Sequence, residues 1–150
     1  MEITTDTIKK LREMTSVSVM QCKKALEEAG GDLAKAEVIL KKHSATSALK
    51  KADRALKAGV IGSYTHDDAV GAMALLSCES DFVAKNPEFV ALARELAMQV
   101  AAMDPEDVDS LLEQSYIKDE HKTILNILNE ATQKFGERVE MSRFVRISAR

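Results

Sequence analysis

Apolar and polar residues recur with the period of short helices through the first part of the chain, residues 1–42. The apolar positions of the first run are Ile8, Leu11 and Met14. Ser18 precedes a second run as its expected N-cap, and the pair Gly30-Gly31 ends that run. Asp32 then caps a third run. We therefore expect residues 1–42 to form a small bundle of three short helices.

The segment 43–58 is rich in alanine, serine and lysine, and we expect it to form a linker helix between the bundle and the rest of the chain. The basic residues in and beside it are Lys41, Lys42, Lys50, Lys51, Arg54 and Lys57. A solvated helical face explains such a run of charges, and a docking surface for acidic groups is the alternative. Gly59 marks the end of this helix.

Two runs with strand character, 60–65 and 70–76, flank a short polar loop and predict an antiparallel hairpin. A late strand over 138–147 is expected to pair with this hairpin, although Arg143 interrupts its apolar face. Helices are expected over 87–103, near 111–112 and over 121–135. The sequence therefore predicts an α+β protein, in which residues 59–150 form a core domain with a small three-stranded antiparallel sheet packed with helices.

A short connector between the second strand run and the helix that begins at Pro87 holds an acid and a large aromatic side by side, Asp81 and Phe82. Connectors lie at the surface and often present functional residues, so we expect this pair to be inserted into a partner. Two alternatives stay open, namely that Asp81 caps the connector and that Phe82 folds back into the core. Cys78, at the end of the strand run, is expected to be a small buried hydrophobe.

The composition narrows the possible functions. A formal charge of −3 and an aromatic content of 4% disfavour nucleic acid as a partner, because phosphate binding favours a basic excess and base stacking needs aromatic rings. The three histidines and two cysteines are far apart in sequence, which argues against a metal site and against nucleophilic catalysis. We expect a protein that is not an enzyme and has no cofactor. The acidic N-terminus and the lack of a long apolar run predict a cytoplasmic protein that does not bind membranes.

Four ordered blocks of the chain resemble the elongation factor Ts family, and the match is collinear over essentially the whole chain. The blocks are Leu11–Thr15 with Met20–Ala29 and Gly31-Asp32, then Lys50–Arg54, then Cys78–Asn86, and finally Gly136-Glu137 with Arg143–Arg146. The resemblance implies a translation factor that exchanges guanine nucleotide on the GTPase elongation factor Tu. It also implies that the first three helices form a bundle similar to a ubiquitin-associated domain.

The resemblance assigns two sets of site residues. The turn that disturbs the magnesium and phosphate site of elongation factor Tu, and so releases GDP, corresponds to Ser80, Asp81, Phe82 and Val83. The bundle would dock on the GTPase through Leu11, Met14, Met20 and Lys23. The chain departs from the family pattern by a serine for threonine at Ser80, and by Ser16-Val17-Ser18 where the family has Gly-Ala-Gly.

The chain is similar to the short members of the family, which lack a second core half and a coiled coil. Those members supply the second half by dimerising, so the resemblance implies a homodimer. Two other functions stay open. One is a non-catalytic adaptor whose bundle binds a ubiquitin-like or ribosomal protein, and the other is a paralogue that has lost exchange activity.

Overall fold

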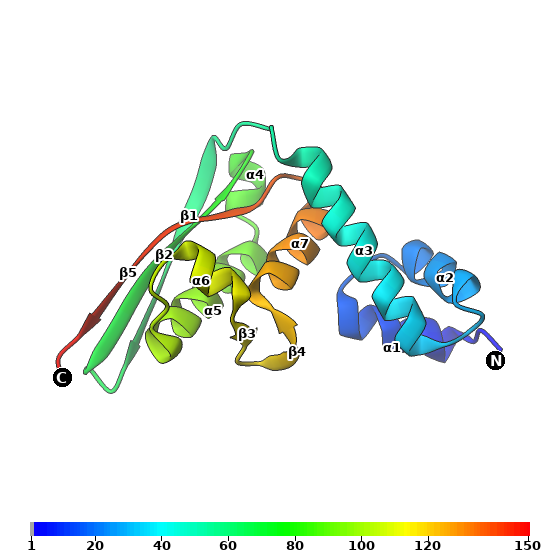
Figure 1. Cartoon of the computed structure of the whole chain (residues 1–150). Helices are drawn as coiled ribbons and strands as arrows, with labels where there is room; N and C mark the ends of the chain where they lie inside the picture. The colour runs from blue at the N-terminus through cyan, green and yellow to red at the C-terminus, as the bar shows by residue number, and fades with distance from the viewer. Residues whose placement is uncertain (1) are drawn as a thin grey trace.

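Three helices open the computed structural model, which describes residues 2–150 (Figure 1). They are α1 (Thr5–Thr15), α2 (Val19–Glu28) and α3 (Leu33–Lys51). Each begins at a side-chain cap, because Thr4, Ser18 and Asp32 accept hydrogen bonds from backbone N–H groups of the first turn. Their common core consists of Leu11, Val17, Cys22, Ala25, Leu26, Ala36 and Leu40. The predicted bundle of three helices is confirmed.

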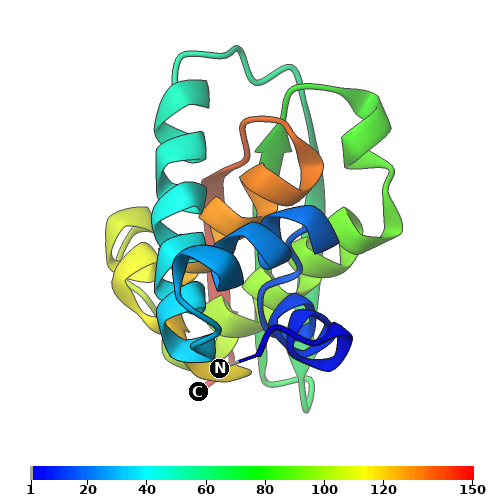
Figure 2. The ribbon, with the colours of Figure 1, turned by 90° about the vertical axis from the view of Figure 1, so that its right-hand side faces the viewer.

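The basic segment expected as a linker helix is continuous with the third helix of the bundle. α3 runs without interruption from Leu33 to Lys51, because neither glycine nor proline lies inside it. Residues 55–57 then lead into the core without regular structure. The domain boundary expected at residue 43 therefore falls inside one helix. Seen from the side of the bundle, α3 lies along α7 (Ile124–Phe135) and ties the bundle to the core (Figure 2).

The core is built on a three-stranded antiparallel sheet with the strand order β1-β2-β5. Its strands are β1 (Ala58–His66), β2 (Val70–Cys78) and β5 (Glu140–Ser148). Asp67 and Asp68 turn the β1–β2 loop with φ angles of 50° and 54°, a region that aspartate tolerates better than most residues. The predicted hairpin and its pairing with the late strand are both confirmed.

Helices cover one face of this sheet. α5 (Pro87–Met103) packs against all three strands, and α6 (Val108–Glu113) and α7 complete the core around it. The largest fully buried side chains of this core are Leu76, Phe89, Leu96, Leu111, Ile124 and Met141. No element among residues 2–150 covers the opposite face of the sheet, which leaves apolar side chains in solvent (Figure 1).

A small ribbon that the sequence did not predict precedes the last helix. β3 (Ser115–Tyr116) pairs with β4 (Asp119–Thr123), and α7 begins only at Ile124. The helix begins there because Thr123 and Asn126 form a capping box, in which each side chain accepts a hydrogen bond from the other residue's backbone N–H. The predicted helix start at residue 121 is therefore wrong.

Candidate functional site

The connector after β2 forms a single helical turn, α4 (Asp81–Ala84), at the end of the sheet opposite the β1–β2 loop (Figure 1). Ser80 is its N-cap, since the Ser80 hydroxyl accepts a hydrogen bond from the Val83 N–H at 3.3 Å. Val83 is buried, whereas Asp81 is exposed and Phe82 has 86% of its surface in solvent. The expected exposure of the pair is confirmed. Neither alternative occurs, because Ser80 is the cap and the Phe82 ring lies outside the core.

The backbone of this turn is bonded to the segment that joins α7 to β5. The Glu137 carboxylate accepts hydrogen bonds from the N–H groups of Glu79 at 3.1 Å and of Ser80 at 2.9 Å. It also accepts a hydrogen bond from the Ser80 hydroxyl, with the two oxygens 2.6 Å apart. In return, the Glu79 carboxylate accepts the Arg138 N–H at 2.5 Å. Glu137 lies in one of the blocks that carry the family resemblance, but its role could not be inferred from the sequence, since its partners lie far away in the chain.

Cys78, at the end of β2, holds the start of α4 in place through a buried, unreactive thiol. It is fully buried at the end of β2, and its Sγ donates a hydrogen bond to the Ser80 carbonyl at 3.3 Å. Burial raises the pKa of the Cys78 thiol, which keeps it protonated at neutral pH. The predicted structural role is confirmed. Among residues 2–150, no group of three histidine, cysteine, aspartate or glutamate side chains is arranged to hold a metal ion, and no helix could span a bilayer.

The four residues expected to dock the bundle on a partner do not share one environment. Leu11 is fully buried in the core of the bundle, so it holds the helices together and presents no surface to a partner. Met14 and Met20 are 38% and 69% exposed, and Lys23 is also at the surface. Leu11 is therefore removed from the expected docking set, while the other three residues are accessible.

Ser16 ends α1 in a conformation that normally favours glycine. Its φ of 59° lies in the left-handed region, and its N–H closes the helix by donating to the Arg12 carbonyl at 2.7 Å. The family glycine expected at this position would adopt this conformation without steric strain. Ser16 thus adopts the left-handed conformation that ends α1, although it is not a glycine.

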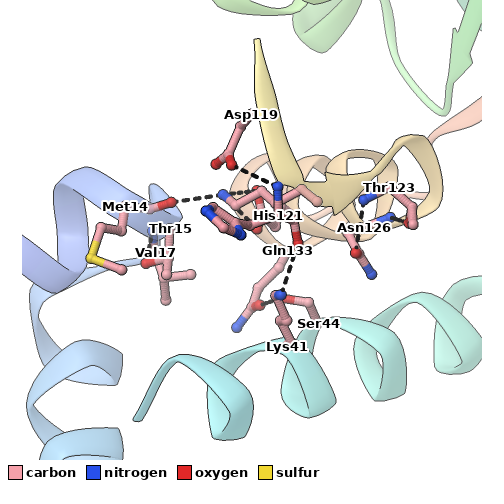
Figure 3. A network of polar contacts seen from close by, with 12 residues as sticks. Met14, Thr15, Val17, Lys41, Ser44, Asp119, His121, Thr123, Asn126 and Gln133 are labelled. Atoms are coloured by element: carbon pink, nitrogen blue, oxygen red, sulfur yellow. Dashed lines mark hydrogen bonds and ion pairs between the residues drawn. The ribbon is translucent and has the colours of Figure 1, made fainter. Parts of the chain in front are cut away.

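Polar contacts hold the bundle against the core (Figure 3). The Lys122 ammonium donates to the Met14 carbonyl at the end of α1 at 2.7 Å, and it forms an ion pair with Glu130 at 2.9 Å. Gln133 of α7 bonds to Ser44 of α3 and to Gln21 of α2. These contacts fix the end of α1, which carries Met14, relative to the core.

The ion pair at this junction is buried, with 8% of the Lys122 side chain and 15% of the Glu130 side chain exposed. Burial raises the pKa of Glu130, against the opposing attraction of Lys122. Removing one partner of a buried pair leaves the other charge uncompensated, so we expect Lys122→Met to lower the free energy of unfolding by about 3 kcal/mol. Urea denaturation measures this loss.

A matched control is Lys118→Met, which removes a more exposed lysine (52%) from its ion pair with Glu95. Such a pair contributes less than about 1 kcal/mol. An equal loss of stability in the two variants would show that the buried pair contributes no more to the free energy of unfolding than the exposed one.

Three known proteins that are similar to this chain carry the same name, elongation factor Ts. The family model named Elongation factor TS matches residues 79–150. Elongation factor Ts from Thermotoga petrophila is 40% identical over 190 positions, which take in 97% of this chain and 96% of the relative. Elongation factor Ts from Thermodesulfovibrio yellowstonii is 38% identical over 97% of this chain and 96% of its own length. That from Pseudothermotoga lettingae is 38% identical over 98% of each chain.

The aligned stretch is longer than this chain. It spans 190 positions with the Thermotoga petrophila protein, whereas the chain has 150 residues, so the relative carries additional residues inside the aligned region. The match nevertheless takes in both the bundle and the core, and its identity is well above the level at which homology is in question. The chain therefore belongs to the elongation factor Ts family.

Proposed function

We propose that this chain is a guanine-nucleotide exchange factor that binds elongation factor Tu in its GDP form and promotes the release of GDP. Its family consists of translation elongation factors. The observation that carries the proposal is the Phe82 ring, 86% exposed beside the Asp81 carboxylate on a capped turn. An aromatic side chain held on a rigid turn is suited to enter a pocket of a protein partner. The chain performs no covalent chemistry of its own, and it acts in the cytoplasm, where translation takes place.

Exchange by such a protein is a linkage effect. A factor that binds the nucleotide-free GTPase more tightly than the GDP form must weaken GDP binding by the same ratio. Phe82 enters an apolar pocket of the GTPase, and Asp81 disturbs the magnesium ion or its water ligands. Without the ion, the phosphate charge of GDP is less compensated, so GDP dissociates faster. Ser80 and Val83 serve this step by capping and anchoring the turn.

The bundle supplies a second contact with the GTPase. Met14 and Met20 offer flexible apolar side chains at its surface, and Lys23 adds a positive charge. This contact increases the affinity of the complex, whereas the turn carries the exchange itself. A bundle that bound its partner without accelerating release would make the chain an adaptor or an inactive paralogue.

The test is stopped-flow release of a fluorescent GDP analogue from elongation factor Tu of the same source, with and without the chain. Acceleration that grows with the concentration of the chain and then saturates is the expected result. Binding measured by sedimentation in the same buffer separates the alternatives. If the chain binds elongation factor Tu and release stays at its spontaneous rate, the exchange proposal is wrong and the adaptor or inactive-paralogue function takes its place.

The exchange factor works as a homodimer joined through the uncovered face of its sheet. Four side chains point outward there, with exposed fractions of 62% for Ile61, 49% for Met73, 38% for Val145 and 74% for Ile147. Three of them, Ile61, Met73 and Val145, line a shallow groove of about 260 Å³. Apolar side chains clustered on one sheet face are typical of an interaction site, and a second copy offers the same face in a two-fold arrangement.

Replacing Met73 by aspartate places a charge at the centre of this face and should convert a dimer into a monomer. Met73 pairs with Ser63 on one side and Val145 on the other, so its side chain lies on the middle strand. Analytical ultracentrifugation measures the change. Ile117→Asp is the matched control, because Ile117 is also exposed, at 42%, but lies in the β3–β4 ribbon. A parent protein that sediments as a monomer at micromolar concentration rules out the dimer.

A further inference from the structure

The carboxylate of Glu137 lies where three hydrogen-bond donors of Glu79 and Ser80, just before α4, converge. One oxygen accepts the N–H groups of Glu79 and Ser80, at 3.1 and 2.9 Å, and the other accepts the Ser80 hydroxyl at 2.6 Å. Hydrogen bonds to an ionised carboxylate are shorter and stronger than neutral ones. Glu137 itself is only partly exposed.

Among the residues that the structure describes, these donors have no other hydrogen-bond partner. β2 ends at Cys78, so the N–H groups of the next two residues lie beyond the ladder that pairs β2 with its neighbours. Leaving a partly buried backbone N–H without a hydrogen-bond partner destabilises the folded state. Glu137 therefore determines the path of the chain where it leaves the sheet for α4.

The Ser80 hydroxyl links Glu137 to the exposed residues Asp81 and Phe82. It donates a hydrogen bond to Glu137, which leaves the lone pairs of the hydroxyl oxygen free to accept a hydrogen bond from the Val83 N–H at 3.3 Å. This second bond is the N-cap of α4, whose first two residues are Asp81 and Phe82. The carboxylate thus orients the cap, and the cap orients the two side chains.

Glu137 is itself well placed to act as a fixed support. Gly136 ends α7 with a φ of 70°, and it directs the following residue toward the end of β2. A second bond runs in the opposite direction, from the Arg138 N–H to the Glu79 carboxylate at 2.5 Å, so the two segments are bonded to each other from both sides. Glu137 therefore lies in the short segment between α7 and β5, two elements of the packed core.

We propose that Glu137 is a positioning residue for nucleotide exchange, which holds the Asp81–Phe82 turn in its active conformation without touching the partner. This inference rests on the proposed exchange function. Loss of the carboxylate frees the turn, so ordering the turn on the GTPase costs conformational entropy at each binding event. We expect Glu137→Ala to slow factor-catalysed GDP release about tenfold at limiting concentration.

Companion variants define how Glu137 acts. Glu137→Gln keeps one carbonyl acceptor for the N–H groups and should lose less activity than Glu137→Ala. Ser80→Ala should resemble Glu137→Ala, whereas Ser80→Thr keeps the hydroxyl and should retain activity. Glu140→Ala is the matched control, because Glu140 is a nearby exposed carboxylate whose ion pair is with Arg138. In a Phe82→Ala background, Glu137→Ala should have a smaller effect than in the parent, since the part of its effect that acts through Phe82 is already lost.

Amide hydrogen exchange of the free chain tests the positioning independently of activity. We expect the N–H groups of Ser80 and Val83 to lose protection in Glu137→Ala and to keep it in Glu140→Ala. Unchanged protection in Glu137→Ala, or full exchange activity of that variant beside an active parent, overturns the inference and leaves the exchange function standing. An inactive parent removes the exchange function, and the protection measurement then still decides whether Glu137 holds the turn.

Discussion

Replacing Phe82 by alanine should slow GDP release catalysed by this chain about 30-fold or more, because truncating an aromatic hot spot costs about 2 kcal/mol or more. The ring is 86% exposed, so its removal leaves the free energy of unfolding nearly unchanged. Activity and stability are therefore expected to separate in this variant. Stopped-flow release of a fluorescent GDP analogue gives the rate, and urea denaturation gives the stability.

The control for Phe82→Ala must remove a similarly exposed apolar side chain elsewhere. Leu49 is 78% exposed near the end of α3, outside the turn and outside the accessible docking residues. Leu49→Ala should retain the parent rate. If Phe82→Ala releases GDP as fast as the parent, the ring does not act as the wedge, and the exposed aromatic needs another explanation.

Asp81 is expected to act through the magnesium ion, which allows its role to be separated from that of Phe82. Asp81→Asn keeps the size of the side chain and removes its charge. Its deficit in exchange rate should shrink when magnesium is chelated, because the ion it disturbs is then already absent. The deficit of Phe82→Ala should persist under the same condition. A magnesium-independent deficit in Asp81→Asn would assign Asp81 to a direct contact with the GTPase.

Local signals were sufficient for most of the fold. Ser18 and Asp32 mark helix starts through their own side chains, and Asn86 with Pro87 marks the start of α5. The hairpin followed from two strand runs around a polar loop. Each of these features depends on residues within a few positions of one another, which is the range that periodicity and capping describe. The exposure of Phe82 was likewise predictable from its place in a connector.

Features that depend on distant partners were not predictable in this way. The Glu137 carboxylate meets Glu79 and Ser80 only after α7 has packed beside the sheet. Leu11 looked available for docking, yet the second and third helices enclose it. The β3–β4 ribbon is short and polar, so neither strand carries an alternating apolar pattern. Tertiary packing determines all three, and the family resemblance indicated only the block that contains Glu137.

A methyl group at position 62 should be the most damaging small substitution in the core. Gly62 lies on β1 where α5 crosses it, and a Cβ there would overlap the backbone carbonyl of Ala93 and the amide nitrogen of Arg94. Backbone cannot move aside as a flexible side chain can, so the helix and the sheet must separate. Because overpacking of this kind costs about 3 kcal/mol or more, Gly62→Ala should lower the urea midpoint strongly.

Gly71 provides the matched comparison within the same sheet. A Cβ there would approach the Thr65 side-chain methyl at 3.3 Å and the Tyr64 carbonyl oxygen at 3.5 Å, contacts that small shifts relieve. Gly71→Ala should therefore change the free energy of unfolding by less than about 1 kcal/mol. Equal stability of the two variants would mean that α5 does not lie against β1 as closely as this packing requires. A selective loss at Gly62 would instead show that the helix–sheet contact tolerates added volume less well than the outer face of the sheet does. The turn α4 leads directly from β2 into that same helix.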